Sequence, residues 1–137
     1  TDYLETYQVQ VVELSVNKLG KITVHKITCV VDCGQVFNTR FAKQQLEGGI
    51  LFGLTAAIKG EINVQNGQIV QSNFDDYPML KLKDIPEIIV HLMKSHKPPG
   101  GLGEAGTPLI GPAVANAVFA ATGKRVRKLP IKRNILV

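Results

Sequence analysis

The chain has 137 residues, of which 45% are apolar and 20% charged, a composition typical of a globular domain and not of a disordered or fibrous protein. No apolar stretch approaches the ~20 residues that a membrane-spanning helix needs. The formal net charge of +5 is concentrated at one end, because residues 1–123 carry ten basic and eleven acidic side chains whereas residues 124–137 carry six basic ones and no acid. The chain begins without Met and without a signal-peptide pattern, so we expect a processed product or an excised piece of a longer chain.

Two β-strands joined by a turn are predicted first. Residues 6–16 alternate in polarity and residues 21–32 are rich in β-branched side chains, with a turn at residues 17–20 that makes them a hairpin. Cys29 and Cys33 have no further cysteines to complete a four-cysteine metal site. A disulfide between them would not meet the required geometry within one strand, so we expect buried free thiols.

A helix is predicted over residues 39–58, capped by Asn38 or Thr39. Gln45 lies beside a stripe of small residues, where its amide can donate and accept a hydrogen bond or can remain a solvated surface group. The stripe consists of Ala42, Leu46, Gly49, Gly53 and Ala57. Glycine in a helix interior costs about 1 kcal/mol relative to Ala. The presence of three glycines therefore indicates close approach of backbone or cofactor; they are Gly48, Gly49 and Gly53.

The middle of the chain predicts a second hairpin and a further strand. Residues 61–64 and 68–71 flank Asn66-Gly67, a strong hairpin turn signal. Residues 86–93 are predicted to form a central or half-buried strand.

A second helix is predicted over residues 110–122, with Pro112 in its first turn and Gly123 just past its end. Residues 125–131 are expected to be extended. The order β-β-α-β-β-β-α-β predicts an α+β fold in two layers, with a mixed or antiparallel sheet and the helices on one face. We expect residues 1–137 to form one domain.

A loop rich in glycine and proline, residues 97–108, contains Glu104. Residues 101–106 spell Gly-x-Gly-x-x-Gly, but Pro98-Pro99 separates them from the strand, later prolines delay the helix, and no acidic residue follows. A dinucleotide-binding fingerprint needs all three features, so we reject that interpretation. Two alternatives stay open for Glu104: it is a base on a loop that a ligand can approach closely, or it anchors the unpaired N–H groups of the following helix.

The basic tail, residues 124–137, is either a solvated end or a site for an anion, nucleic acid or acidic partner. Its lack of aromatic side chains disfavours single-stranded nucleic acid. The three histidines lack metal-site spacing and are expected to be structural or exposed; they are His25, His91 and His96.

Four segments of the chain, in order, resemble the C-terminal part of the molybdopterin-binding subunit of molybdenum hydroxylases, the xanthine dehydrogenase and aldehyde oxidase family. They are residues 31–38 (VDCGQVFN), 45–54 (QLEGGILFGL), 101–104 (GLGE) and 112–123 (PAVANAVFAATG). The sequence of these segments is most similar to that of the large (beta) subunit of isoquinoline 1-oxidoreductase-type bacterial enzymes.

The resemblance implies hydroxylation of an N-heterocycle or aldehyde with water as the oxygen source. It implies that Glu104 is the general base beside the molybdenum, that Gln45 binds the molybdopterin, and that Gly103 lets the backbone approach it. No side chain of the chain is assigned as a metal ligand. The cofactor implied is molybdopterin, in its cytosine dinucleotide form, and a small partner subunit is expected to carry two iron–sulfur clusters.

One departure from the family pattern concerns the residues after the base. Xanthine dehydrogenases carry Glu-Pro-Pro there, whereas this chain has Glu104-Ala-Gly-Thr-Pro108, which favours the isoquinoline-type branch and leaves the substrate open. The other cofactor loops of the family lie upstream of this chain, so we expect a C-terminal fragment that is inactive by itself. The alternatives are a non-catalytic interaction domain that keeps the fold, or an anion or nucleic-acid binder acting through the basic tail.

Overall fold

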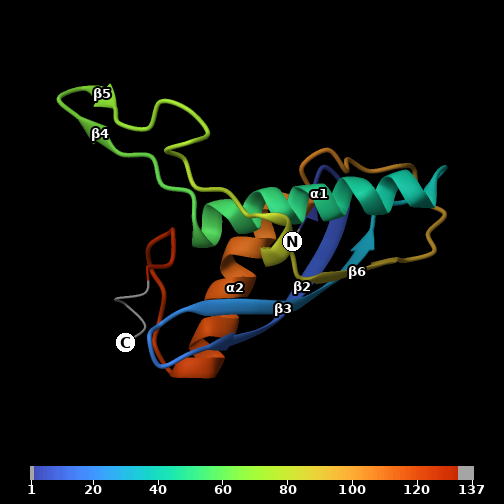
Figure 1. Ribbon diagram of the computed structural model, residues 1–137. Helices are drawn as coiled ribbons and strands as arrows, with labels where there is room; N and C mark the ends of the chain where they lie inside the picture. Colours follow the sequence, from blue (N-terminus) through green and yellow to red (C-terminus); the bar gives the residue numbers. More distant parts are fainter. Residues whose placement is uncertain (1, 133–137) are drawn as a thin grey trace.

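The computed structural model describes residues 2–132 and places both helices on one face of a four-stranded sheet (Figure 1). The sheet has the strand order β1-β2-β3-β6; β1–β2 and β2–β3 are antiparallel, and β3–β6 is parallel. The predicted two-layer α+β fold with a mixed sheet is confirmed. Its strands are β1 (Asp2–Tyr3), β2 (Thr6–Val16), β3 (Ile22–Asp32) and β6 (Glu87–Leu92).

The β2–β3 hairpin contains one irregularity that changes which side chains face the helices. The register shifts between Glu13 and Leu14, which pair with Lys26 and Val24, so that His25 is the extra residue of a β-bulge. Because side chains alternate between the two faces of a strand, this extra residue switches which positions of β3 point inward.

Helix α1 (Thr39–Ile58) begins as its sequence predicts. The Asn38 side chain accepts a hydrogen bond from the Phe41 N–H, which satisfies one of the unpaired donors of the first turn. The helix ends at Lys59, whose N–H donates to the Thr55 carbonyl.

Helix α2 (Gly106–Thr122) begins four residues earlier than predicted. Pro108 does not delay it, because the N–H groups of a first turn have no partner within the helix and proline loses nothing there. Pro112 consequently lies inside the helix and not in its first turn, which corrects the prediction. Gly123 ends the helix at φ 71, the left-handed conformation that glycine adopts without a steric penalty.

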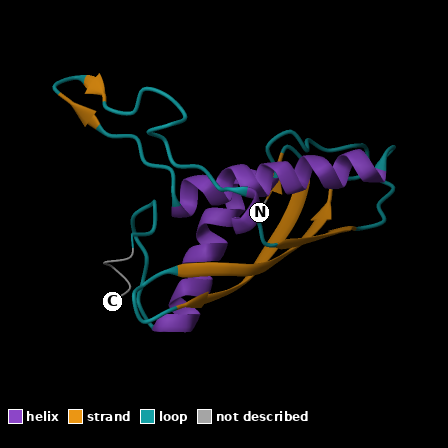
Figure 2. Cartoon of the chain, in the orientation of Figure 1, coloured by secondary structure: helices purple, strands orange, loops and turns teal. Residues whose placement is uncertain are grey.

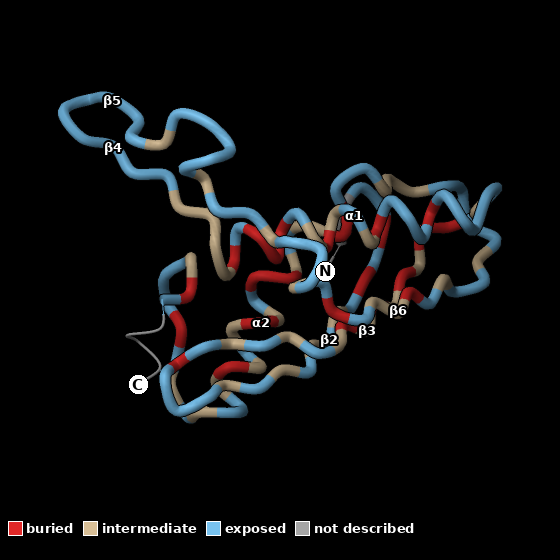
Figure 3. The backbone as a smooth tube through the Cα atoms, viewed as in Figure 1, coloured by how far each residue is buried: buried red, intermediate tan, exposed pale blue. Residues whose placement is uncertain are grey.

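The core lies between the sheet and the helices (Figure 3). It is formed by fully buried aliphatic side chains from β3 and both helices, including Ile27, Val31, Leu46, Ile50, Leu54, Ile110, Val114 and Val118. The opposite face of the sheet exposes apolar side chains of β2 by half or more: Tyr7 (50%), Val9 (60%) and Val11 (58%).

The segment between α1 and β6 projects from the body as a short hairpin flanked by long loops (Figure 2). Its strands, β4 (Val64–Gln65) and β5 (Gln68–Ile69), are shorter than predicted and meet at the expected Asn66-Gly67 turn. A 3-10 helix, η1 (Leu82–Asp84), follows before the chain enters β6.

The segment after α2 differs from its prediction, because residues 125–131 join no sheet. Buried Val126 and Ile131 hold it against the body, and the Ile131 N–H donates to the Ala57 carbonyl of α1. Two of its basic side chains have partners. The Arg125 guanidinium carbon lies 3.5 Å from the centre of the Phe119 ring, and Lys132 Nζ lies 2.8 Å from Glu61 Oε1. The rest of the predicted tail, residues 133–137, lies outside the described residues.

Within residues 2–132, no helix has the length and hydropathy needed to cross a membrane.

The two helices approach each other closely at three glycines. A Cβ atom on Gly106 would lie 2.6 Å from the Leu46 carbonyl oxygen, and one on Gly53 would lie 2.6 Å from the Thr107 carbonyl oxygen. Gly49 faces the same contact, with Thr107 Oγ1 at 3.3 Å from its Cβ position. Backbone, and not cofactor, therefore explains Gly49 and Gly53 of the predicted stripe, whereas Gly48 faces open space.

Replacing Gly53 with alanine should destabilise the chain by about 1–3 kcal/mol, because the new methyl group forces α1 and α2 apart. Gly48→Ala is the matched control on the same helix, and it should raise stability by roughly 0.5–1 kcal/mol because nothing lies within 4 Å of its Cβ position. Urea unfolding followed by circular dichroism measures both. Equal stability of the two variants would contradict the close contact.

Candidate functional site

The loop between β6 and α2 is held to α1 by a side-chain hydrogen bond. Gln45 Nε2 donates to the Gly103 carbonyl oxygen at 2.6 Å, although the two residues lie 58 positions apart. Two of the three residues predicted for the site are therefore in direct contact, and the third, Glu104, is next to Gly103 in the chain. Gln45, Gly103 and Glu104 are all exposed, so a ligand can reach them.

The start of this loop is fixed by the segment that follows β3. The Gln35 N–H donates to the Lys97 carbonyl, and the Gly100 N–H donates to the Cys33 carbonyl. Gly34 has a φ of +70, and a Cβ there would lie 2.0 Å from the Pro98 carbonyl oxygen, so only glycine fits. Residues 33–35 therefore support the start of the glycine loop.

Charge also links these two segments. The Gly34 N–H donates to Asp32 Oδ1 at 3.2 Å, and Lys97 Nζ lies 3.7 Å from Asp32 Oδ2. The pKa of Asp32 is held below its usual value, first by the Gly34 hydrogen bond and further by Ser95 and Lys97, so the carboxylate stays ionised.

The end of the loop is fixed by two glutamines that the sequence analysis did not identify. Gln8 Nε2 donates to the Ala105 carbonyl, and Gln10 Nε2 donates to the Gly106 carbonyl at 2.9 Å. Both side chains extend from the helix-facing side of β2. The signal in the sequence was weak, because the apolar residues of β2 change from odd to even positions between Val11 and Val12.

The Glu104 side chain does not cap α2. The N-cap residue is Ala105, with no side-chain hydrogen bond to the first turn, while the Glu104 carbonyl accepts from the Thr107 N–H. Within residues 2–132 the Glu104 carboxylate has no hydrogen-bond or ion-pair partner. This geometry favours the first of the two alternatives for Glu104, a carboxylate that is open to a ligand.

The same residues fit the organic part of a molybdopterin. The Gln45 amide donates to Gly103 and keeps its Oε1 acceptor available, and a Cβ on Gly103 would meet nothing within 4 Å. A flat, polar group can therefore lie against bare backbone beside an amide and a carboxylate. No group of three or more His, Cys, Asp or Glu side chains that could hold a metal ion occurs among residues 2–132.

Cysteine takes part in this arrangement through the Cys33 carbonyl, which accepts from the Gly100 N–H, and through the Cys29 thiol, which lies 3.9 Å from Gln8 Oε1. Cys29 and Cys33 are buried free thiols, as predicted. Burial raises the pKa of Cys29 to about 11, a shift that a hydrogen bond with Gln10 opposes only in part. His25 lies in the β-bulge, where Nε2 forms a hydrogen bond with Ser15 Oγ at 2.8 Å, and His91 is exposed on β6.

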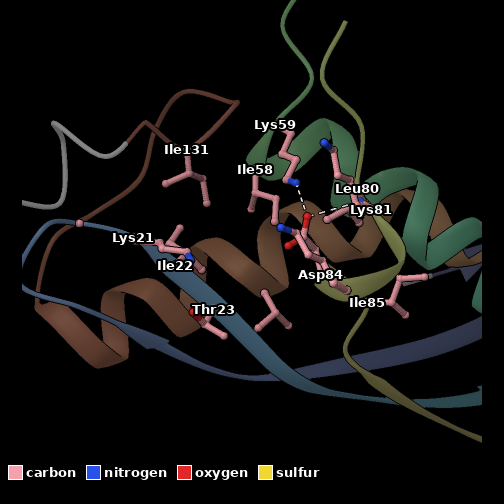
Figure 4. Close-up of a pocket in the computed structure, with 13 residues that line it drawn as sticks. Lys21, Ile22, Thr23, Ile58, Lys59, Leu80, Lys81, Asp84, Ile85 and Ile131 are labelled. Carbon is pink, nitrogen blue, oxygen red and sulfur yellow. Dashed lines mark hydrogen bonds and ion pairs between the residues drawn. The ribbon is translucent and has the colours of Figure 1, made fainter. Parts of the chain in front are cut away.

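A pocket of about 530 Å³ is lined by residues other than those of the glycine loop and lies between the start of β3, the end of α1 and η1 (Figure 4). Inside it, Lys59 Nζ pairs with Asp84 Oδ2 at 2.5 Å. The Lys59 hydrogen bond is the main cause of the lowered pKa of Asp84. This ion pair ties η1 to the end of α1, and none of Gln45, Gly103 and Glu104 lines the pocket.

The chain is similar to known proteins over nearly its whole length. A model of the molybdopterin cofactor-binding domain matches residues 2–86, which excludes Glu104. The isoquinoline 1-oxidoreductase subunit beta of Brevundimonas diminuta is 36% identical over 133 residues, which are 96% of this chain and 17% of that protein. A membrane-bound aldehyde dehydrogenase [pyrroloquinoline-quinone] of Gluconacetobacter polyoxogenes is 39% identical over 113 residues, 82% of this chain and 15% of that protein.

Solved structures agree with the fold. The aldehyde oxidoreductase of Desulfovibrio desulfuricans ATCC 27774 superposes with a TM-score of 0.83 at 24% identity, over 96% of this chain and 15% of that one. The chain therefore spans less than a fifth of the length of the relatives that it matches.

The raised pKa of Cys29 predicts a loss of stability at alkaline pH. The folded thiol holds its proton up to about pH 11, whereas an ordinary thiol releases it near 9.0, so folding is penalised increasingly as the pH rises between these values. Urea unfolding at pH 7 and pH 10 should show a larger loss for the native sequence than for Cys29→Ala. Equal losses in the two proteins would contradict the shift.

Proposed function

The chain belongs to the family of molybdopterin cofactor-binding domains, and from this we propose that it is one domain at the C-terminal end of the large subunit of a molybdenum hydroxylase. The proposed reaction is oxidation of an N-heterocycle or an aldehyde with water as the oxygen source, with Glu104 as the general base. The names of similar proteins, among them an isoquinoline oxidoreductase and an aldehyde oxidoreductase, support these substrate classes.

One observation carries the proposal: Gln45 and Gly103 are joined by a hydrogen bond, directly beside a carboxylate that is exposed and unpaired within residues 2–132. In the reaction R–H and water become R–OH, with release of two protons and two electrons. The bound cofactor would supply the electron acceptor and the Lewis acidity. Glu104 would accept the first proton at a carboxylate oxygen, for which it has to lie within hydrogen-bond reach of the attacking oxygen.

The other residues of the site would bind and orient. Gln45 would donate to Gly103 and accept from a polar N–H of the pterin through Oε1. Gly103 would bring backbone into van der Waals contact with the cofactor, because no side chain stands between them. We propose the cytosine dinucleotide form of molybdopterin here, and a partner subunit with two iron–sulfur clusters to remove the electrons.

The remainder of the large subunit is the proposed partner of the uncovered face of the sheet. Tyr7, Val9 and Val11 form an apolar row there, and such rows are usually covered in a complete protein. The relatives are several times longer than this chain, and a subunit of that length would have enough polypeptide to cover the row and to complete the cofactor site.

In the complete holoenzyme, Glu104→Gln should lower turnover by about 10²–10⁴-fold, the usual contribution of a general base. The amide has nearly the same shape and cannot take up the proton, so the molybdenum content should stay at the native level. Steady-state kinetics and metal analysis measure the two effects. Glu87→Gln, which removes an exposed carboxylate from β6, is the control. Native turnover in Glu104→Gln would refute the assignment of Glu104 as the general base.

The isolated 137-residue chain should bind no molybdenum and turn over no substrate, because it would form only one wall of the cofactor site. Inductively coupled plasma mass spectrometry of the purified chain measures the metal, and extraction of the intact subunit identifies the cofactor. Stoichiometric molybdenum in the isolated chain would overturn this expectation. Recovery of pyrroloquinoline quinone from the intact subunit would overturn the cofactor assignment.

A further inference from the structure

We propose that Gln8 and Gln10 of β2 are positioning residues for Glu104: they hold the backbone just after the base and so fix where its carboxylate points. The inference rests on the proposed role of Glu104. Neither glutamine reaches the exposed site, and both act through the loop.

The contacts enclose the base from both sides. Gln45 holds the carbonyl of Gly103, one residue before Glu104. Gln8 holds the carbonyl of Ala105, one residue after it, and Gln10 holds the carbonyl of Gly106. Three side-chain amides from two separate elements thus donate hydrogen bonds to the backbone of residues 103–106. Of these four residues, only Glu104 has a carbonyl that none of the three amides contacts.

These bonds are not needed to satisfy the helix. At the start of a helix the unpaired groups are N–H donors, whereas the carbonyls of the N-cap and first residues accept from N–H groups further along. The carbonyls of Ala105 and Gly106 therefore have intrahelical donors available and use a second lone pair for the glutamines. The extra bonds determine the position of the helix start and do not repair an unpaired group.

Burial of amide atoms on this face has a cost that an apolar residue would avoid. Gln8 is 3% exposed, and neighbouring inward positions of the same strand hold Val12 and Leu14. The Oε1 atom of Gln10 is buried and has no hydrogen-bond partner within residues 2–132, so in this part of the chain the Gln10 amide acts only as a donor. An unpaired buried oxygen is unfavourable. A donor that holds the loop explains why an amide, and not an apolar side chain, stands at this position.

Gln10 and Cys29 orient the Gln8 amide. Gln10 Nε2 lies 3.4 Å from Gln8 Oε1, and Cys29 Sγ lies 3.9 Å from the same oxygen. Because an amide oxygen can only accept, these two donors favour the orientation of Gln8 in which Oε1 faces them and Nε2 faces the loop. In that orientation Nε2 donates to the Ala105 carbonyl.

The test uses the complete holoenzyme with Gln10→Met or Gln8→Met. Methionine keeps the length of glutamine and removes the donor. Leu14→Met is the matched control on the same strand and face, because a leucine side chain has no donor to lose. We expect the glutamine variants to lose about 10- to 100-fold in kcat, the effect of a small misplacement of a catalytic group, with KM within about twofold and native molybdenum content. The control should keep native kcat.

Two further measurements separate positioning from a loss of structure. Amide hydrogen exchange across residues 101–107 should become faster in the glutamine variants and stay native in Leu14→Met. In a Glu104→Gln background, Gln10→Met should cause little additional loss of kcat, since the group that it positions is already absent. A full multiplicative loss in the double variant, or unchanged exchange in both glutamine variants, would overturn the proposal.

Failure of the proposed function would look different. If Glu104→Gln kept native turnover while exchange across residues 101–107 rose in Gln10→Met, the grip on the loop would exist but the base would be misassigned. That result would remove Gln8 and Gln10 as positioning residues of the reaction.

Discussion

The contact between α1 and α2 is the constraint on which the candidate site depends. At Gly53 and Gly106 the two helices lie so close that a single methyl group would collide with backbone oxygen atoms. Thr107 adds a hydrogen bond from its Oγ1 to the Gly49 carbonyl at 3.2 Å. Because a densely packed interior is hardly compressible, this contact fixes the start of α2 relative to α1. The loop that precedes α2 has to end at that place.

Once the helices are fixed, the backbone of the glycine loop has few remaining freedoms. The start of the loop is hydrogen-bonded to the Cys33 carbonyl, and its end accepts hydrogen bonds from Gln8 and Gln10. Gln45 donates a hydrogen bond to its middle. A backbone held so often can present an exposed side chain in a defined direction without burying it. Catalytic groups require such preorganisation, because small errors of placement reduce rates steeply. The conformational freedom of glycine is thus restricted by hydrogen bonds from outside the loop.

The residues that match the family include those that hold the loop, and not the loop itself. The family match ends at residue 86, and the loop with Glu104 lies beyond it. The matched part nevertheless supplies Gln8, Gln10, Gln45 and the segment around Gly34, which are the groups that hold the loop. Under the proposed function, the domain would act as a support that positions the Glu104 carboxylate beside the cofactor. The greater part of that cofactor's surroundings would come from the rest of a subunit several times longer.

The sequence by itself determined the features that depend on neighbouring residues. The strands at 6–16 and 21–32, the Asn38 cap, the Asn66-Gly67 turn and the Gly123 helix end all follow from local chemistry, and the order of four short segments revealed the family. The tertiary structure decided what depends on residues far apart in the chain. It alone showed that Gln8 and Gln10 face inward, that α2 begins at Gly106, and that residues 125–131 rest on α1 without forming a strand. The reason is physical: a cap or turn is stabilised within a few residues, whereas a bond between Gln45 and Gly103 forms only after the packing of α1 against α2 has brought them together.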